Sequence, residues 1–167
     1  MTLHELNSSD TQQLIGTLML CCGSTNWAQY IAESRPYANL DALIKKSDAV
    51  WNSLSESDWQ EAFTHHPKIG DIESLRKKFA STAVWAEGEQ SGTAMATDDV
   101  LKKLAALNDE YQKKYGYIFI VCATGKSAEE MLAILESRLE NEPDDEIRIA
   151  AGEQQKITNI RLKKLLA

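Results

Sequence analysis

Apolar residues recur at the spacing of one helix face along almost the whole chain. Only residues 117–123 have the β-branched and aromatic content of a strand, and Gly116 and Gly125 bound them. A single strand without a partner cannot form a sheet. The sequence therefore predicts an all-α helical bundle with one buried irregular or extended stretch near 117–123. The backbone N–H and C=O groups of that stretch need partners, and some of them could serve a ligand.

Capping residues predict where the helices begin. Ser8 or Ser9 is expected to cap the first helix. Residues 72–80 are expected to form an amphipathic helix, and residues 81–97, which are small and polar, a loop or broken helix. The other expected helix starts are Ser24, Asn39, Ser55 with Asp58, Thr97-Asp98-Asp99, Ser127 with Glu130, and Pro143.

The composition is typical of one globular domain spanning residues 1–167, with 43% hydrophobic residues and a net charge of −7. This charge disfavours nucleic acid as a partner, because phosphate binding needs a basic face. Cys21 and Cys22 are adjacent and Cys122 is distant, so we expect three reduced, mostly buried thiols. The sequence shows neither a signal-peptide pattern nor an apolar run that could span a bilayer. We therefore expect a cytoplasmic protein without membrane contact.

His66 is the first candidate for chemistry. It lies at the predicted end of a helix, and Pro67 follows it and restricts the backbone. An imidazole can give or take a proton near neutral pH. The position also suits a histidine that only caps the helix, because a cation is favourable at a helix C-terminus. His65 would point about 100° away on a helix, so the two rings cannot share one face.

Two further segments could contribute polar groups. Glu87-Gly88-Glu89-Gln90 combines carboxylates with an amide, although it also suits a solvated loop. Arg161 lies on an apolar helix face, and its planar guanidinium could bind an anion. It could equally extend to the solvent or form a structural ion pair. Arg138 near Glu142 is typical of a helix-surface pair. No motif for a phosphate loop, a nucleophile elbow or a metal site is present.

Several short motifs occur in a fixed order along most of the chain. They are His66-Pro67-Lys68-Ile69-Gly70, Glu89-Gln90-Ser91-Gly92, Leu107-Asn108-Asp109-Glu110-Tyr111 leading to the run from Tyr115 to Val121, Arg138-Leu139-Glu140-Asn141, and Lys156-Ile157 with Arg161-Leu162. In this order the sequence resembles the OHCU decarboxylases, which act on 2-oxo-4-hydroxy-4-carboxy-5-ureidoimidazoline (OHCU).

The resemblance implies an all-α homodimer that converts OHCU to (S)-allantoin and CO2 in uric acid (purine) degradation, without metal or organic cofactor. It implies that His66 is the catalytic histidine, acting as acid or base at the carbon that carries the hydroxyl and carboxylate. Glu89 would hold or protonate the ureido side, and Arg161 would anchor an anionic group. The other implied substrate-binding positions are Pro67, Ala86, Gln90, Val121, Cys122 and Ala123.

Ala86 departs from the family pattern, which often has a serine at this position. A hydroxyl contact to the substrate is then missing or supplied elsewhere, for instance by Ser91 or Thr93. Two alternatives therefore stand beside the decarboxylase. One is the same fold acting on a related ureido or imidazoline acid. The other is a non-enzymatic helical interaction module, in which His66 only caps a helix.

Overall fold

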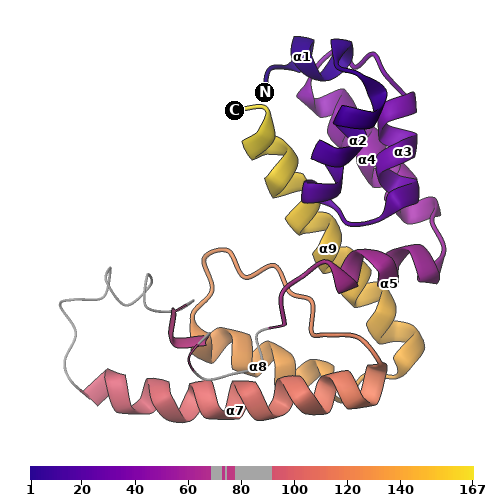
Figure 1. The fold of residues 1–167 in the computed structure, drawn as a ribbon. Helices are drawn as coiled ribbons and strands as arrows, with labels where there is room; N and C mark the ends of the chain where they lie inside the picture. The colour runs from indigo at the N-terminus through magenta and orange to yellow at the C-terminus, as the bar shows by residue number, and fades with distance from the viewer. Residues whose placement is uncertain (69–72, 74, 78–91) are drawn as a thin grey trace. The chain divides into compact units, whose positions relative to one another are not determined.

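The structure is a computed structural model that describes residues 1–68, 73, 75–77 and 92–167. Within these residues every regular element is an α-helix and no strand occurs, which confirms the all-α prediction. The chain divides by its internal contacts into two compact units, and each is described by itself (Figure 1). The first unit contains Met1–His66, Ile120–Cys122 and Ile147–Ala167, and the second contains Pro67–Phe119 and Ala123–Glu146.

Helix α3 forms the centre of the first unit and packs against α2, α4 and α5. Its Trp27 is fully buried and donates its indole N–H to Ser47 Oγ at 3.2 Å. Burying a large apolar side chain contributes about 1.5–3 kcal/mol. The helices of this unit are α1 (Leu3–Ser8), α2 (Thr11–Cys21), α3 (Thr25–Glu33), α4 (Leu40–Ser53), α5 (Glu56–Thr64) and the part of α9 (Pro143–Leu165) from residue 147 onward.

The N-terminal helices differ from the prediction. A short helix, α1, was not expected; Thr2 and Glu5 form a capping box at its start. The cap of α2 is Asp10, whose carboxylate accepts the N–H groups of Gln12 and Gln13 at 3.0 and 3.1 Å. The prediction that Ser8 or Ser9 caps this helix is therefore wrong, because Ser8 is the last residue of α1 and Ser9 is its C-cap. The caps Ser24, Asn39 and Ser55 with Asp58 are confirmed.

Helix α9 is tied to α4 within the first unit. The indole N–H of Trp51 donates to the Ala151 carbonyl at 2.9 Å. The amide of Asn159 donates to Asp48 Oδ1 at 3.1 Å. These two contacts lie on the same side of α9, since eight residues make a little over two helical turns. They fix both the position and the rotation of α9 against α4.

The second unit is built from α7 (Gly92–Tyr115) and α8 (Ala128–Arg138), which pack against each other (Figure 1). Gly116 ends α7 as predicted, with a φ of 86° that favours glycine. The predicted cap of α8, Ser127, and the predicted start of α9 at Pro143 are confirmed. No helix in the described part of the chain is long and apolar enough to cross a membrane.

Helix α7 begins earlier than predicted, at Gly92 rather than at Thr97-Asp98-Asp99. The Asp98 carboxylate instead binds the guanidinium of Arg76, with two contacts of 3.2 Å. The carboxylate that was expected to cap the start of the helix therefore forms an ion pair with Arg76 instead. A loop or broken helix was expected over residues 81–97; residues 92–97 are helical, and residues 81–91 lie outside the described residues. Of the predicted helix 72–80, residues 73 and 75–77 are described and helical.

Residues 117–123 contain neither helix nor strand, as expected from their lack of a pairing partner. Tyr117, Ile120 and Cys122 are buried, whereas the residues between them are half-buried. Ile120–Cys122 belong to the first unit, and the residues on either side belong to the second. This stretch is therefore irregular, and three buried side chains anchor it.

Candidate active site

His66 follows directly after α5. His65 is the C-cap of that helix, and the His66 backbone N–H donates to the Phe63 carbonyl at 3.3 Å. Pro67 comes next and has no N–H to continue the helix. The His66 side chain is half-buried, while the neighbouring His65 and Pro67 are exposed. The helix thus ends two residues before His66, and the C-cap and Pro67 on either side restrict the backbone that carries the His66 ring.

The start of α3 holds the end of α5. Gly23 approaches the His65 ring so closely that a Cβ at this position would lie 2.3 Å from His65 Cγ. Thr25 donates its backbone N–H and its hydroxyl to the Glu61 carboxylate at 3.1 and 2.5 Å. A carboxylate is favourable at a helix N-terminus. These contacts fix the segment from which His66 projects.

The ring of His66 reaches helix α9. Its Nε2 hydrogen-bonds to the side-chain oxygen of Gln154. Gln154 is fully buried, and its amide N–H donates to Thr158 Oγ1 at 3.2 Å. The Thr158 hydroxyl in turn donates to the Gln154 backbone carbonyl at 3.0 Å. His66, Gln154 and Thr158 therefore form one connected chain of hydrogen bonds within the first unit.

Arg161 lies on the same helix, seven residues after Gln154 and so on the same face, roughly 10 Å along the axis. Its Nη1 donates to the carbonyl oxygens of Leu20 and Cys21 at 3.4 and 3.3 Å. These carbonyls belong to the last turn of α2, where a cation is favourable. The residue as a whole is half-buried. It is held in place while part of it remains exposed to solvent.

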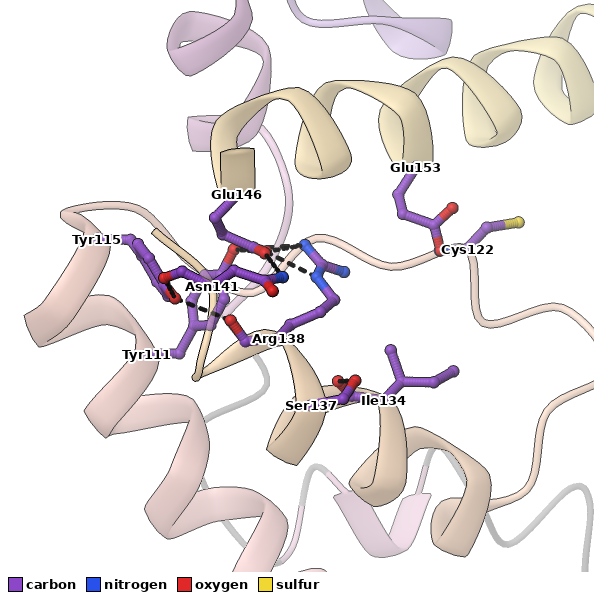
Figure 2. Close-up of polar contacts among 9 residues, drawn as sticks. All are labelled: Tyr111, Tyr115, Cys122, Ile134, Ser137, Arg138, Asn141, Glu146 and Glu153. Atoms are coloured by element: carbon purple, nitrogen blue, oxygen red, sulfur yellow. Dashed lines mark hydrogen bonds and ion pairs between the residues drawn. The ribbon is translucent and has the colours of Figure 1, made fainter. Parts of the chain in front are cut away.

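The backbone at Cys122 also meets α9. The Cys122 N–H donates to Glu153 Oε1 at 3.4 Å, as Figure 2 shows for the two residues. Lys156 pairs with the other Glu153 oxygen at 2.5 Å. Two adjacent residues of α9, Glu153 and Gln154, thus bind the irregular stretch and the His66 ring respectively.

The thiols near this site are not activated. Cys21, Cys22 and Cys122 are all buried, as expected. Burial raises the pKa of Cys22 to about 11, and burial also raises the pKa of Cys21. Both groups therefore stay protonated at neutral pH and are poor nucleophiles.

The first unit brings together several of the predicted site positions. His66, Val121, Cys122 and Arg161 all belong to it, and three of them contact or lie on α9. Pro67 and Ala123 belong to the second unit. Ala86, Glu89 and Gln90 lie outside the described residues.

Gln154 and Thr158 were missed at the sequence level, although the sequence carries a signal for them. In the part of α9 that belongs to the first unit, the buried residues are Ile147, Ala150, Ala151, Gln154, Thr158 and Leu162. Two polar side chains four residues apart on an otherwise apolar stripe need partners once buried. This pattern could have identified them as the residues that receive a polar group from elsewhere.

Arg138 is not the surface residue that its spacing to Glu142 indicated. It is buried and pairs with Glu146, with Nη2 and Nε at 2.6 and 2.7 Å from Glu146 Oε1. Figure 2 shows Tyr111 and Asn141 converging on the same carboxylate. The Tyr111 hydroxyl donates to Glu146 Oε1 at 2.5 Å, and the Asn141 amide to Oε2 at 2.9 Å. The prediction was wrong because Glu146 is fully buried, so that its charge requires a buried cation.

This second polar centre is enclosed by aromatic rings. The Arg138 guanidinium lies 4.6 Å from the centre of the Phe119 ring and 5.7 Å from that of Tyr111. Burial raises the pKa of Tyr111, so its hydroxyl remains a donor. Every one of these residues belongs to the second unit. The arrangement is that of a structural ion pair rather than of a site open to a ligand.

Among the described residues, no three His, Cys, Asp or Glu side chains are grouped so that they could hold a metal ion. The fold and the first polar centre define an all-helical protein in which one histidine side chain is held by a buried amide.

Comparison with known proteins assigns the family. Residues 7–163 match the family model described as OHCU decarboxylase, so the chain belongs to the OHCU decarboxylase family. A solved structure, described as OHCU decarboxylase in the presence of (S)-allantoin, is 37% identical and superimposes with a TM-score of 0.71. The match covers 90% of this chain and 96% of that chain.

Two curated relatives illustrate the range of the family. The Arabidopsis thaliana "Uric acid degradation bifunctional protein TTL" is 42% identical over 89% of this chain and 46% of its own length. The Mus musculus "2-oxo-4-hydroxy-4-carboxy-5-ureidoimidazoline decarboxylase" is 28% identical over 99% of this chain and 93% of its own length. The chain thus spans less than half the length of the bifunctional relatives that it matches.

Proposed function

We propose that this protein decarboxylates OHCU to (S)-allantoin in uric acid degradation. The observation that carries the proposal is the match to the solved OHCU decarboxylase with (S)-allantoin, which covers nearly the full length of both chains. The curated relatives are also named for uric acid degradation or for this decarboxylation. The His66 ring, held at the end of α5, supplies a group that can move protons near neutral pH.

The substrate carries its own electron sink. The bond to the carboxylate breaks and its electron pair moves toward the adjacent C=N bond, whose nitrogen takes up a proton as CO2 leaves. The hydroxyl of the resulting enol then loses its proton, and the carbon that carries the ureido group gains one. The balance is one proton taken up for each CO2 released. No pyridoxal, thiamine or metal is needed to hold the electron pair.

The chain's residues then have three tasks. We assign the proton exchange at the hydroxyl- and carboxyl-bearing carbon to His66 and the ureido side to Glu89. Arg161 anchors an anionic group, because its guanidinium is held at the end of α2 with part of its surface exposed. The remaining substrate contacts are assigned to Pro67, Ala86, Gln90 and the backbone of Val121, Cys122 and Ala123.

The backbone assignment can be made more specific. The Cys122 N–H already donates to Glu153, so a ligand that took this N–H would have to displace a carboxylate. The neighbouring backbone groups of Val121 and Ala123 are the better candidates for direct contact. We also propose that the chain acts as one domain, forms a homodimer and works in the cytoplasm. The support for these three points is the family resemblance, with the free state of all three thiols favouring a reducing compartment.

The decisive experiment couples urate oxidation and hydroxyisourate hydrolysis to this protein, so that OHCU is formed freshly in the cuvette. Circular dichroism then follows optically active allantoin. We expect (S)-allantoin to appear faster than the slow spontaneous racemic product, with unchanged rates after exhaustive chelation. A rate equal to that of the spontaneous reaction would overturn the proposal, and activity lost on chelation and restored by a metal would overturn its cofactor-free form.

A further inference from the structure

We propose that Gly23 is a positioning residue for the reaction: the space left by its missing side chain receives the His65 side chain, and this contact sets where the His66 ring lies. Gly23 belongs to the short junction between α2 and α3. Its role in catalysis rests on the proposed function, whereas the place of the His66 ring is a property of the ligand-free protein. The two can therefore fail separately.

The junction needs a glycine for space and not for backbone conformation. Among the described glycines, only Gly116 and Gly125 have the positive φ that other residues rarely adopt. A Cβ at Gly23 would lie 2.5 Å from the His65 Cβ and 2.7 Å from its Cδ2. The His65 Cβ is fixed to its backbone, so a change of rotamer cannot relieve this contact. Because non-bonded carbon atoms approach to about 3.5–4.0 Å, a methyl group here would displace the His65 backbone by about 1 Å.

A displaced His65 would move His66 with it. The two residues are consecutive, and both backbone N–H groups donate to the Phe63 carbonyl at the end of α5. The ring of His66 is held at its other end by the hydrogen bond from Nε2 to fully buried Gln154. A shift of the backbone therefore changes the direction of the ring or breaks this hydrogen bond.

The same junction also holds the proposed anion anchor. Arg161 Nη1 donates to the carbonyls of Leu20 and Cys21, which come shortly before Gly23. One short segment of backbone thus carries the contacts of Arg161 and of His65, and all of these residues belong to the first unit. The spacing between a proton-exchanging ring and an anion anchor must match the substrate. A misplacement of about 1 Å can cost on the order of 10² in rate.

Two further contacts attach α5 to the start of α3. The Glu61 carboxylate accepts the backbone N–H and the hydroxyl of Thr25 at 3.1 and 2.5 Å. Asp58 Oδ1 accepts the Asn26 amide N–H at 2.8 Å. The two carboxylates lie about one and two helical turns before His65. Crowding at the junction is therefore expected to displace the end of the helix rather than to release the helix.

The first test is the kinetics of a series of variants of the full-length protein. Gly23→Ala should lower kcat for allantoin formation by about tenfold to 100-fold. KM should change less than about twofold, because the carbonyls that hold Arg161 precede the junction. Adding His65→Ala keeps the crowded Cβ and should relieve the loss only in part. Adding His65→Gly removes every crowded atom, so kcat should then equal that of His65→Gly alone, itself within about twofold of wild type.

Gly16→Ala is the matched control, because it adds the same methyl group to α2 where no atom lies within 4 Å. It should change neither kcat nor KM. If Gly23→Ala does not fold, its combinations with His65→Ala and His65→Gly decide by the order of their kcat values. A wild-type kcat in Gly23→Ala, or a loss that His65→Gly does not relieve, would overturn the proposal.

The place of the His66 ring is measured separately, by the imidazole NMR signals of the ligand-free protein. The chain has three histidines, so His4→Gln and His65→Asn assign the signals of the third. We expect the His66 signals to move in Gly23→Ala, to return when His65→Gly is added, and to stay unchanged in Gly16→Ala. Unmoved signals in Gly23→Ala would overturn the positioning role. Moved signals with no allantoin formation by the wild-type protein would refute the proposed function but not the placement of the ring.

Discussion

The two polar centres of this molecule satisfy buried groups in opposite ways. In the first unit, half-buried His66 is held by Gln154 and Thr158, an uncharged chain of hydrogen bonds. In the second unit, Arg138 and Glu146 form a buried ion pair whose side chains are 6% and 0% exposed. The first arrangement leaves a titratable ring accessible, and the second closes a charge pair away from water. A catalytic side chain must be held in position and still be accessible to the substrate, as the His66 ring is. A fully enclosed ion pair can only act within the fold.

The largest expected effect is on turnover, at the first centre. His66→Asn removes the group that exchanges protons, and acid–base catalysis is typically worth about 10² to 10⁴ in rate. We expect kcat for allantoin formation to fall by that factor. The midpoint of urea unfolding should change little, because the ring is half-buried. His65→Asn, at the exposed neighbouring residue, is the control and should retain activity.

The second centre should respond in stability rather than in turnover. Glu146→Gln removes the carboxylate charge that the buried Arg138 cation pairs with, and breaking a buried ion pair typically costs about 3–5 kcal/mol. Urea titration measures this loss. Glu142→Gln alters the exposed carboxylate that the spacing had indicated as the partner, and it should stay within about 0.5 kcal/mol of wild type. Equal losses in the two variants would refute the buried pair.

Alkaline pH provides a test of the uncharged character of the first centre. Burial raises the pKa of Cys22 from 9.0 to about 11, so the folded state holds this proton more tightly than the unfolded chain. The protonated thiol contributes fully to the free energy of unfolding below pH 9, and this contribution is lost as the pH rises toward 11. The loss amounts to about 2–3 kcal/mol. Cys22→Ala should flatten this part of the stability profile, and an unchanged slope would show that another group is responsible.

The smallest expected effect concerns Arg161. Arg161→Ala should raise KM by about tenfold or more, since hydrogen bonds to charged groups contribute about 1.5–3 kcal/mol. Arg161→Lys keeps the charge but loses the planar fork, so we expect an intermediate KM. Steady-state kinetics of both variants separates the two contributions. An unchanged KM in Arg161→Ala would make the residue purely structural, as a cap of α2.

Local patterns predicted much of this architecture. The helical periodicity and the caps at Ser24, Asn39, Ser55 and Ser127 depend on neighbouring residues, and they were predicted correctly. Partners that lie in another helix were not predicted. Arg138 was assigned to Glu142 because both lie on nearby helical turns, yet burial selects Glu146.

The candidate site shows the same limit. His66 and Gln154 are 88 positions apart, and nothing local in the sequence around either residue specifies the other. The motif order pointed to His66 and Arg161 through the family, whereas the amide that holds the ring appears only when α9 is packed in the first unit. Tertiary contacts of this kind arise from packing, which periodicity does not encode.

The central claim is that chemistry belongs to the His66 centre and stability to the Arg138 centre. The most direct test is the rate of optically active allantoin formation per folded molecule, measured for His66→Asn and Glu146→Gln with freshly generated OHCU. We predict a loss of about 10² to 10⁴ for His66→Asn and a rate near that of wild type for Glu146→Gln. Near-normal formation of (S)-allantoin by folded His66→Asn would contradict the account.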